Sequence, residues 1–545
     1  MKKFLYIISL AACIMIAASC ADFMETSPTD EVDKDLILNK EEGLEVALDG
    51  VYATLYNRLN FVTANAHQCF GLMAMVLAAE LMGDDMVQTA QGAGWFWKDY
   101  NYEVRSRYTS KIWRCYFTWE YFYEIISNAN YIIAAVPKAE GDKDALDNIL
   151  AQALSLRAYS YFMLIQSFQQ TYAGHEDLPG VPLYTEPSFT STRGKARGTV
   201  SEVYEQICKD LDDALGLFCS SARERSHISH LDLYSTSMVR ARVAMVMHDW
   251  LNAEKNALTV IGRPGCSLLS LNEATVTKGT FDPATKNWTT GRTPFNSVSS
   301  PDVLWGAEII PEQSTVYASF YSNMDACTDV YYAAEAPKCI SNWLYAQIPE
   351  TDVRKGWWNG NIGVSAEEWK YGGHINYNQH KFQWADQKAL KGDYVFMRME
   401  EAYLILAEVK CRMREYDEAK TYLSELMSRR NPEYQYSLRS LVDSDVQTFG
   451  TAGTVTTLMD MILLQRRIEL WGESGRIFDI LRLAKGWTRY WEVGAEMSNH
   501  TNYLSKFPEY LNFPPDYLEC ILMIPQTEID NNPNINAADQ NPYIQ

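Results

Sequence analysis

The sequence predicts an all-α fold built on helix pairs, with long irregular loops and little strand. Apolar residues recur at helical spacing over long stretches, as Leu44, Leu48, Val51 and Leu55 do on one helical face. Two segments show the pattern of a helix, a turn and a returning helix. Between these segments Gly, Pro, Thr, Ser and Asn are frequent and no period is sustained, which predicts functional loops.

The two helix pairs resemble tetratricopeptide repeats, in which small residues lie where the paired helices touch. The first covers residues 237–261, where Ala253 and Ala257 are one turn apart on the returning helix. The second and clearer one covers residues 399–427. Two ordinary antiparallel helix pairs are the alternative, because the internal similarity is weak. Both interpretations predict a helical scaffold.

The first residues are typical of an export signal for a lipoprotein. Lys2 and Lys3 precede an apolar run that ends near Ala17, and small residues lead into Cys20. We therefore expect residues 1–19 to be removed, Cys20 to be lipidated and residues 20–40 to act as a polar tether. An ordinary secretory signal or a short membrane anchor is the alternative, although the run is too short to span a bilayer comfortably.

Charge and composition narrow the class of partner. The formal net charge of −21 disfavours nucleic acid and anionic lipid, and neutral ligands fit better. An apolar content of 47% with 21% charged residues predicts a globular body. The eleven cysteines include no Cys-x-x-Cys pair, so bridges such as Cys208–Cys219 or Cys327–Cys339 and buried free thiols remain open alternatives.

The sequence predicts no catalytic residue, metal site or cofactor. Phosphate-binding loops, zinc-binding helices and nucleophile elbows are all missing from it. His227 and His230 supply only half of a zinc site. The carboxylate pairs Asp84–Asp85 and Glu400–Glu401 are expected to be helix caps and surface charge rather than acid–base pairs, since catalytic carboxylates need a perturbing cleft.

Aromatic residues make up 13% of the chain, and many tryptophans lie outside the helical pattern. Sugar rings stack on aromatic faces, whereas any single tryptophan is more often buried in a core. Taken together, their placement favours at least one exposed aromatic platform. The aromatic residues outside the helical pattern are Trp95, Phe96, Trp97, Tyr100, Tyr102, Tyr317, Tyr321, Trp343, Tyr345, Trp357 and Trp358.

Motifs along nearly the whole mature chain resemble the SusD/RagB family. The most specific is Gln465-Arg466-Arg467-Ile468-Glu469-Leu470, followed by Arg476, Phe478 and Asp479. Segments 472–475 and 171–177 depart from the family pattern, but both are expected to be loops. The other matching segments are 19–24, 112–113 with a long helix ending at an Asn-Ala-Asn turn at 128–130, 156–159, 178–183, 398–408, 524–529 and 531–534.

This resemblance implies a helical lipoprotein that faces the outside of the outer membrane and captures a nutrient, without catalysing a reaction. It would act as a hinged lid over a SusC-like TonB-dependent transporter and deliver an oligosaccharide or polysaccharide to it. Capture of oligopeptides, a tetratricopeptide adaptor that binds only protein, and a lipid-anchored glycosidase are the alternatives. The sequence leaves open whether calcium is bound, since no clear EF-hand loop is present.

The resemblance also implies a division of the chain into parts and roles for individual residues. Residues 41–262 would form an N-terminal helical part, 263–393 an aromatic insertion rich in loops, and 394–545 a C-terminal helical part with a polar tail that is not a further helix. Structural roles, including buried ion pairs, are expected for Arg157, Arg398, Glu401, Arg467, Glu469, Arg476 and Asp479. The positions of ligand contacts in the family suggest Trp95, Trp97, Tyr100, Tyr317, Tyr321 and Trp343.

Overall fold

The structure is a computed structural model that describes residues 38–57, 67–102 and 113–542, except 222, 283–284, 286, 290, 311, 313–317, 327–332, 334, 364–374, 451–452, 490–491, 494–495 and 501–511. Helices dominate these residues, and each sheet among them has only two strands. The predicted helical fold with little strand is therefore confirmed. No helix in the described part of the chain is both long and apolar enough to cross a membrane.

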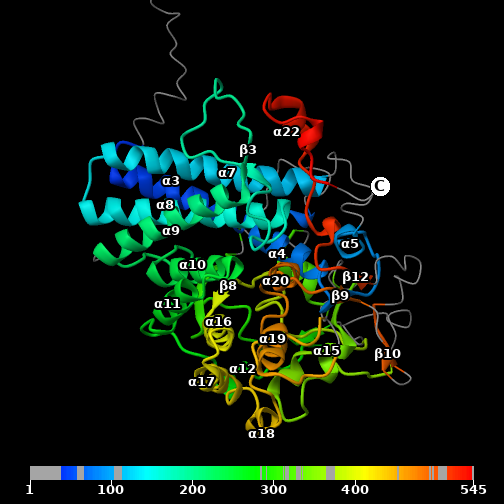
Figure 1. Cartoon of the computed structure of the whole chain (residues 1–545). Coiled ribbons are helices and arrows are strands. Elements are labelled where there is room, and N and C mark those ends of the chain that lie inside the picture. Colours follow the sequence, from blue (N-terminus) through cyan, green and yellow to red (C-terminus); the bar gives the residue numbers. More distant parts are fainter. Residues whose placement is uncertain are drawn as a thin grey trace, which may run out of the picture.

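Four long helices form the upper layer of the molecule in Figure 1: α3 (Glu41–Thr54), α7 (Trp113–Ala135), α8 (Lys143–Phe168) and α9 (Val200–Ser220). The side chain of Asp142 caps α8 by accepting from Ala145 N at 3.1 Å, and α9 begins with a capping box. Helix α8 lies against both α7 and α9 and is buried along most of its length. It is therefore the central helix of this layer.

Both predicted helix pairs are present. The first consists of α10 (Leu233–Met247) and α11 (Trp250–Ile261), and the second of α16 (Met399–Arg412) and α17 (Tyr416–Met427). Left-handed residues make the tight turns, with φ 58° at His248 and 65° at Arg414. Helix α11 packs directly on α16, so the two pairs stack although more than a hundred residues separate them in the sequence.

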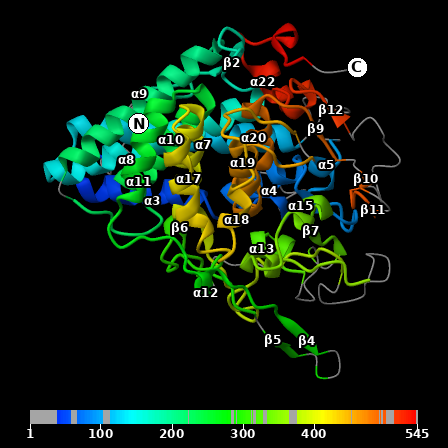
Figure 2. The same ribbon diagram turned by 60° about the horizontal axis from the view of Figure 1, so that its bottom comes forward.

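Short elements fill the region between the two pairs. Its helical pieces are α12 (Leu271–Ala274), α13 (Phe320–Met324), α15 (Asn342–Ala346) and η3 (Val353–Trp357). Strand β6 (Val303–Ala307) pairs with β8 (Tyr394–Arg398), and β7 (Lys338–Ile340) pairs with β1 (Met86–Gln88), which ties this region to the N-terminal part. The hairpin of β4 (Thr280–Asp282) and β5 (Asn287–Thr289) projects from the body in Figure 2.

The remaining elements lie between these layers or at the edges. They are α4 (Leu72–Leu81), α5 (Trp97–Tyr100), η2 (Val136–Lys138), β2 (Pro179–Pro182), β3 (Arg197–Thr199), α18 (Gln435–Leu438), α19 (Leu458–Glu469), α20 (Arg476–Leu483), β9 (Trp487–Thr488), β10 (Glu492–Val493), β11 (Glu496–Met497), β12 (Asn512–Phe513), η5 (Leu518–Cys520), α22 (Gln526–Asn531) and η6 (Ala537–Asp539).

The structure corrects two expectations about local structure. The helix expected to end near residues 128–130 continues to Ala135, because Asn130 points inward and bonds to the backbone of the loop after β2. The polar tail does contain a helix, α22, which begins after Pro525. Proline fixes its own φ and leaves the following residues free to begin a helical turn, so a polar sequence of six residues is enough here.

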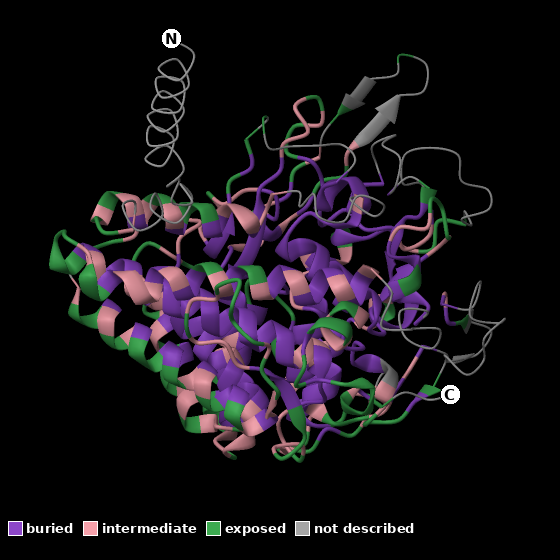
Figure 3. Ribbon diagram, turned by 90° about the horizontal axis from the view of Figure 1, so that it is seen from above, coloured by how far each residue is buried: buried purple, intermediate pink, exposed green. Residues whose placement is uncertain are grey.

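Most tryptophans of the irregular middle are buried in the interior. Figure 3 shows exposed residues on the outer faces of the helices and buried residues throughout the interior. Trp305, Trp357, Trp358 and Trp384 are all among the largest fully buried side chains. The loop-rich region therefore contributes large aromatic rings to the main core, where Trp305 contacts Tyr159 and Trp358 contacts Trp471.

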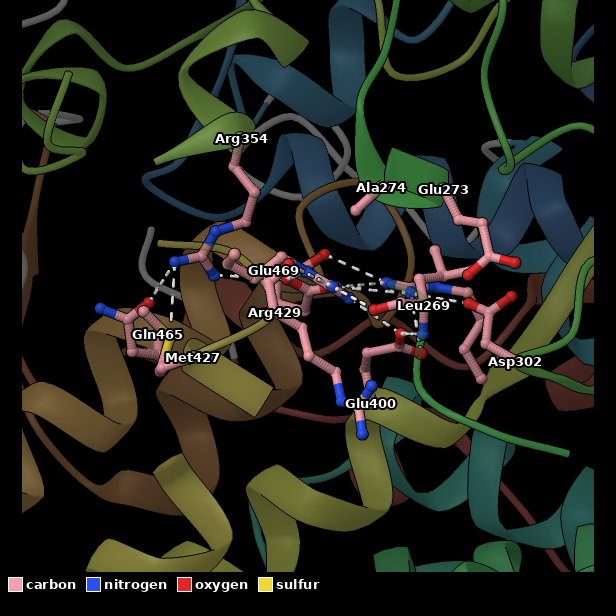
Figure 4. A network of polar contacts seen from close by, with 12 residues as sticks. Leu269, Glu273, Ala274, Asp302, Arg354, Glu400, Met427, Arg429, Gln465 and Glu469 are labelled. Carbon is pink, nitrogen blue, oxygen red and sulfur yellow. Dashed lines mark hydrogen bonds and ion pairs between the residues drawn. The ribbon is translucent and has the colours of Figure 1, made fainter. Parts of the chain in front are cut away.

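One buried carboxylate, Glu469 at the end of α19, is shared by three guanidinium groups. Its oxygens lie 3.0 Å from Arg430 Nη2, 3.3 Å from Arg354 Nη1 and 3.4 Å from Arg398 Nη2, all completely buried or nearly so. Figure 4 shows this network, including Glu400, which lies 2.8 Å from Arg430. Burial alone would raise the pKa of Glu469, but the three arginines outweigh it and hold that pKa below its usual range.

The other residues with an expected structural role also lie in buried ion pairs. Each pair links two different segments of the chain and so fixes one against the other. The shortest pairs are Arg157 with Asp210 at 2.7 Å, Arg467 with Asp85 at 2.6 Å, Arg476 with Asp84 at 2.8 Å, Asp479 with Arg466 at 2.7 Å, Glu401 with Arg242 at 2.5 Å and Arg398 with Glu473 at 2.6 Å.

We expect Glu469→Gln to destabilise the protein by about 3–5 kcal/mol, because it keeps the shape but leaves three buried guanidinium groups without their shared anion. The measurement is chemical unfolding followed by circular dichroism. Asp213→Asn breaks the exposed Lys209–Asp213 pair and serves as the control, with little expected change. An unfolding midpoint of Glu469→Gln equal to that of the control would contradict this role.

Glu80 of α4 should make stability depend on pH. Burial raises its pKa to about 8, although Gly475 N donates to it at 2.7 Å. The pKa of Glu80 in the folded protein is above its ordinary value of 4.5. Its contribution to the free energy of unfolding is therefore fully present below pH 4.5 and is lost as pH rises through about 8.

Glu80→Gln cannot ionise and keeps an oxygen for that hydrogen bond. We expect the melting temperature of the natural protein to fall relative to that of Glu80→Gln between pH 6 and 9. A difference between the two that stays constant over this range would show that Glu80 does not titrate there.

Candidate functional site

One candidate for a ligand site is the loop that connects β1 to α5, which carries the predicted contact Trp95. The side chain of Gln88 closes the loop by donating from Nε2 to the carbonyls of Ala90 and Trp95, both at 3.2 Å. Thr89 Oγ1 donates to Pro337 O at 3.2 Å, which fixes the loop to the chain before β7. The loop is thus held at its base while residues 91–93 are exposed.

Trp95 is partly buried against the core, and its indole nitrogen is enclosed. Gly94 has φ 89° and Phe96 has φ 58°, so the chain reverses on both sides of Trp95. Phe96 N donates to Gln68 Oε1 at 2.6 Å, and this bond holds the second reversal. The half-buried Trp95 ring stacks on His67, with centroids 4.8 Å apart and planes 26° apart. Trp95 is therefore a positioned aromatic ring with surface left for a ligand.

The next two candidates along the chain, Trp97 and Tyr100, lie in the core. They are 4% and 1% exposed. The Tyr100 hydroxyl lies 2.9 Å from His500 Nδ1, and Arg489 lies 4.8 Å from the Tyr100 ring centre. Burial and then Arg489 lower the pKa of His500 to about 3, so this imidazole is neutral at physiological pH. These two rings anchor α5 and offer no stacking face to a ligand in this structure.

Of the candidates in the irregular middle, Tyr317 lies outside the described residues. Tyr321 is 1% exposed and donates to Asp393 O at 2.6 Å. Trp343 is 5% exposed and lies under Arg467, whose guanidinium carbon is 4.9 Å from the ring centre. Of the five candidates that the structure describes, Trp95 is half-buried and the other four are buried, so these five do not share an exposed platform.

Sequence reasoning missed His67, the stacking partner of Trp95. No motif marks it, since it is one of eight histidines and lies twenty-eight positions before its partner ring. The pairing of β1 with β7 could not be read from either strand alone. The signal that was available is the Gly-Ala-Gly run before Trp95, which predicts a turn that presents the following side chain.

The carboxylate pairs that could serve a glycosidase are occupied by arginines. Asp84 and Asp85 are each 1% exposed and bind Arg467 and Arg476. Glu400 and Glu401 are 0% and 2% exposed in the networks described above. Glu401 also lines a small cavity of about 60 Å³, where Arg242 and Arg466 bind it. The expectation that both pairs are surface charge is wrong, since they are buried structural groups.

The described histidines and cysteines form neither a metal site nor a disulfide. His230 Nε2 lies 2.9 Å from Asp49, whereas His227 lies 3.6 Å from Glu308, so the two imidazoles have different partners. In the described part of the chain, no three His, Cys, Asp or Glu side chains are grouped to hold a metal ion. Cys208 and Cys219 are not bridged, and Cys327 lies outside the described residues.

Two family models match the sequence. Residues 22–237 match a SusD-like family described as starch-binding associating with outer membrane, and residues 323–543 match the SusD family. Together the matches cover most of the chain. A comparison of the sequence with curated proteins gives no match.

Solved structures share the fold over almost the whole chain. A SusD-like carbohydrate-binding protein from Bacteroides vulgatus has 22% identity and a TM-score of 0.71, with 93% of this chain and 99% of that chain covered. A SusD superfamily protein from Bacteroides thetaiotaomicron has 22% identity and a TM-score of 0.70, with 92% and 100% covered. Surface glycan-binding protein A from Bacteroides thetaiotaomicron has 15% identity and a TM-score of 0.64, with 93% and 100% covered. The chain belongs to the SusD/RagB family.

Proposed function

We propose that the protein binds an oligosaccharide or polysaccharide at the outer membrane, leaves it chemically unchanged, and delivers it to a SusC-like TonB-dependent transporter. The observation that carries this proposal is the match of both ends of the chain to SusD-family models, one of them described as starch-binding associating with outer membrane. The fold shared with a surface glycan-binding protein supports it. The burial of both carboxylate pairs supports binding without hydrolysis.

Trp95 is our proposed ligand contact. An aromatic face with exposed surface on a loop closed by Gln88 suits the flat C–H face of a sugar ring, while exposed backbone groups of residues 91–93 can bond to its hydroxyls. Because the loop is braced at Thr89, Gln88 and Phe96, the ring is held in place before the ligand arrives.

Trp95→Ala should weaken binding of the preferred glycan at least about tenfold, which corresponds to about 1.4 kcal/mol. The measurement is a glycan array followed by calorimetry with the soluble mature chain. Trp250→Ala is the matched control, because Trp250 is also half-buried and stacks on a histidine, His248, at 4.9 Å. Equal binding by the two variants would remove Trp95 from the site, and binding of peptides but no glycan would favour oligopeptide capture.

The expected anchor is tested separately through Cys20, which lies outside the described residues. We propose that lipid on this cysteine holds the protein on the outer face of the outer membrane, as the Ala-Ser-Cys sequence indicates. Cys20→Ser should move the protein from the membrane fraction to the soluble fraction and abolish its labelling on intact cells. Retention of the variant at the cell surface would contradict lipid anchoring.

A further inference from the structure

A groove of about 570 Å³ lies along α7, the helix labelled in the upper layer of Figure 1. Its other walls are the loop that follows β2 and the short helix α22. This volume is within the range of about 300–1,000 Å³ that small-molecule sites occupy. None of the residues that line it belongs to the loop of Trp95.

Tyrosine rings line the groove. Tyr116 and Tyr123 lie seven positions apart on one face of α7, and Tyr184 faces them from the loop after β2. The rings of Tyr123 and Tyr184 meet edge to face, with centroids 5.8 Å apart and planes 83° apart. All three side chains are half-buried, so they form walls and still expose ring surface.

Three carboxylates share the same groove. Glu120 and Glu124 lie one turn apart on α7, and Glu528 projects from α22. Like charges at this spacing repel one another. In the described part of the chain, no cation shifts the pKa of Glu120 or Glu124. Burial, then Glu528 and Glu124, raise the pKa of Glu120. The groove therefore concentrates negative charge that the fold does not neutralise.

Among the described residues, two cations lie near the tyrosines of the groove, and both bond to other groups. Lys195 Nζ donates to Leu183 O at 2.8 Å and lies 5.6 Å from the centre of the Tyr184 ring. Arg197 donates to the backbone carbonyls of Pro179, Gly180 and Asp539. Both side chains hold the loop after β2 in place, which leaves the carboxylates for an external cation.

We propose that this groove binds an amine-bearing oligosaccharide, with the tyrosine rings stacked on its sugar faces and Glu120 and Glu124 paired with its ammonium groups. The inference rests on the proposed function and names a substrate class for it. A neutral glycan would leave the carboxylates unpaired, whereas the ammonium groups of an amino sugar can pair with carboxylates on this face of α7. The stacking rings favour a sugar over a simple metal cation or polyamine.

The test compares three probes by calorimetry on the soluble mature chain: a glucosamine tetrasaccharide, its fully N-acetylated counterpart, and cellotetraose. We expect the glucosamine tetrasaccharide to bind at least tenfold more tightly than either of the others, and to bind more weakly as salt is raised. Glu120→Gln, Glu124→Gln should lose at least tenfold for this probe. Glu42→Gln, Glu425→Gln removes the same charge at two exposed positions outside the groove and should bind as the natural protein does.

Tyr116→Ala separates stacking from charge and should weaken the glucosamine probe but not a tetralysine peptide. Unchanged binding of the glucosamine probe to Glu120→Gln, Glu124→Gln would overturn the proposal. Tight binding of tetralysine with no glucosamine binding would also overturn it and make the groove a site for a protein segment. If array glycans still bind and depend on Trp95, the proposed function stands even though the groove proposal fails.

Discussion

The fold depends on one carboxylate, Glu469, and on the short segment around it. That carboxylate is surrounded by arginines from η3, from the end of β8 and from the chain after α17. Within the next turns, Glu473 binds Arg398 and the backbone of residues 474–475 binds Glu80 of α4. A single stretch of about eighteen residues, 465–482, therefore connects the helix pairs, the irregular middle and the N-terminal part. A buried charge cannot be left unpaired, so these elements have to assemble together.

Sequence reasoning recovered what local pattern encodes. The two helix pairs follow from apolar period and from Ala253 and Ala257 at the contact, so 237–261 and 399–427 were located from sequence alone. The sequence also predicts structural roles for Glu469 and Asp479, and both lie in buried ion pairs. The partner of Arg467 could not be predicted, because Asp85 lies 382 positions away and nothing local joins the two residues. The stacking of α11 on α16 was hidden for the same reason.

Less of the candidate site than of the fold could be predicted from the sequence. Aromatic residues are easy to count in a sequence, but their orientation is decided by packing. Tyr321 and Trp343 are as aromatic as Trp95, yet one is fixed by a bond to Asp393 O and the other lies against Arg467. In the sequence, only the glycine-containing turn around Gly94 distinguishes Trp95 from the other two. That turn predicts a reversal of the backbone but not the orientation of the ring. Likewise, Tyr116, Glu120, Tyr123 and Glu124 read as an unremarkable helix face until Tyr184 and Glu528 close the groove.

The two kinds of charged group in this protein have different energetics. Glu469 gains enough from three arginines to overcome burial, and its low pKa reflects that balance. No described cation plays that part for Glu120, and its raised pKa reflects burial and the neighbouring carboxylates. Glu120 is half-buried and Glu124 is exposed, so the repulsion between them costs the fold a little and gains it nothing. A bound cation would relieve this repulsion. The free energy that the repulsion costs the folded protein would then add to the free energy of binding.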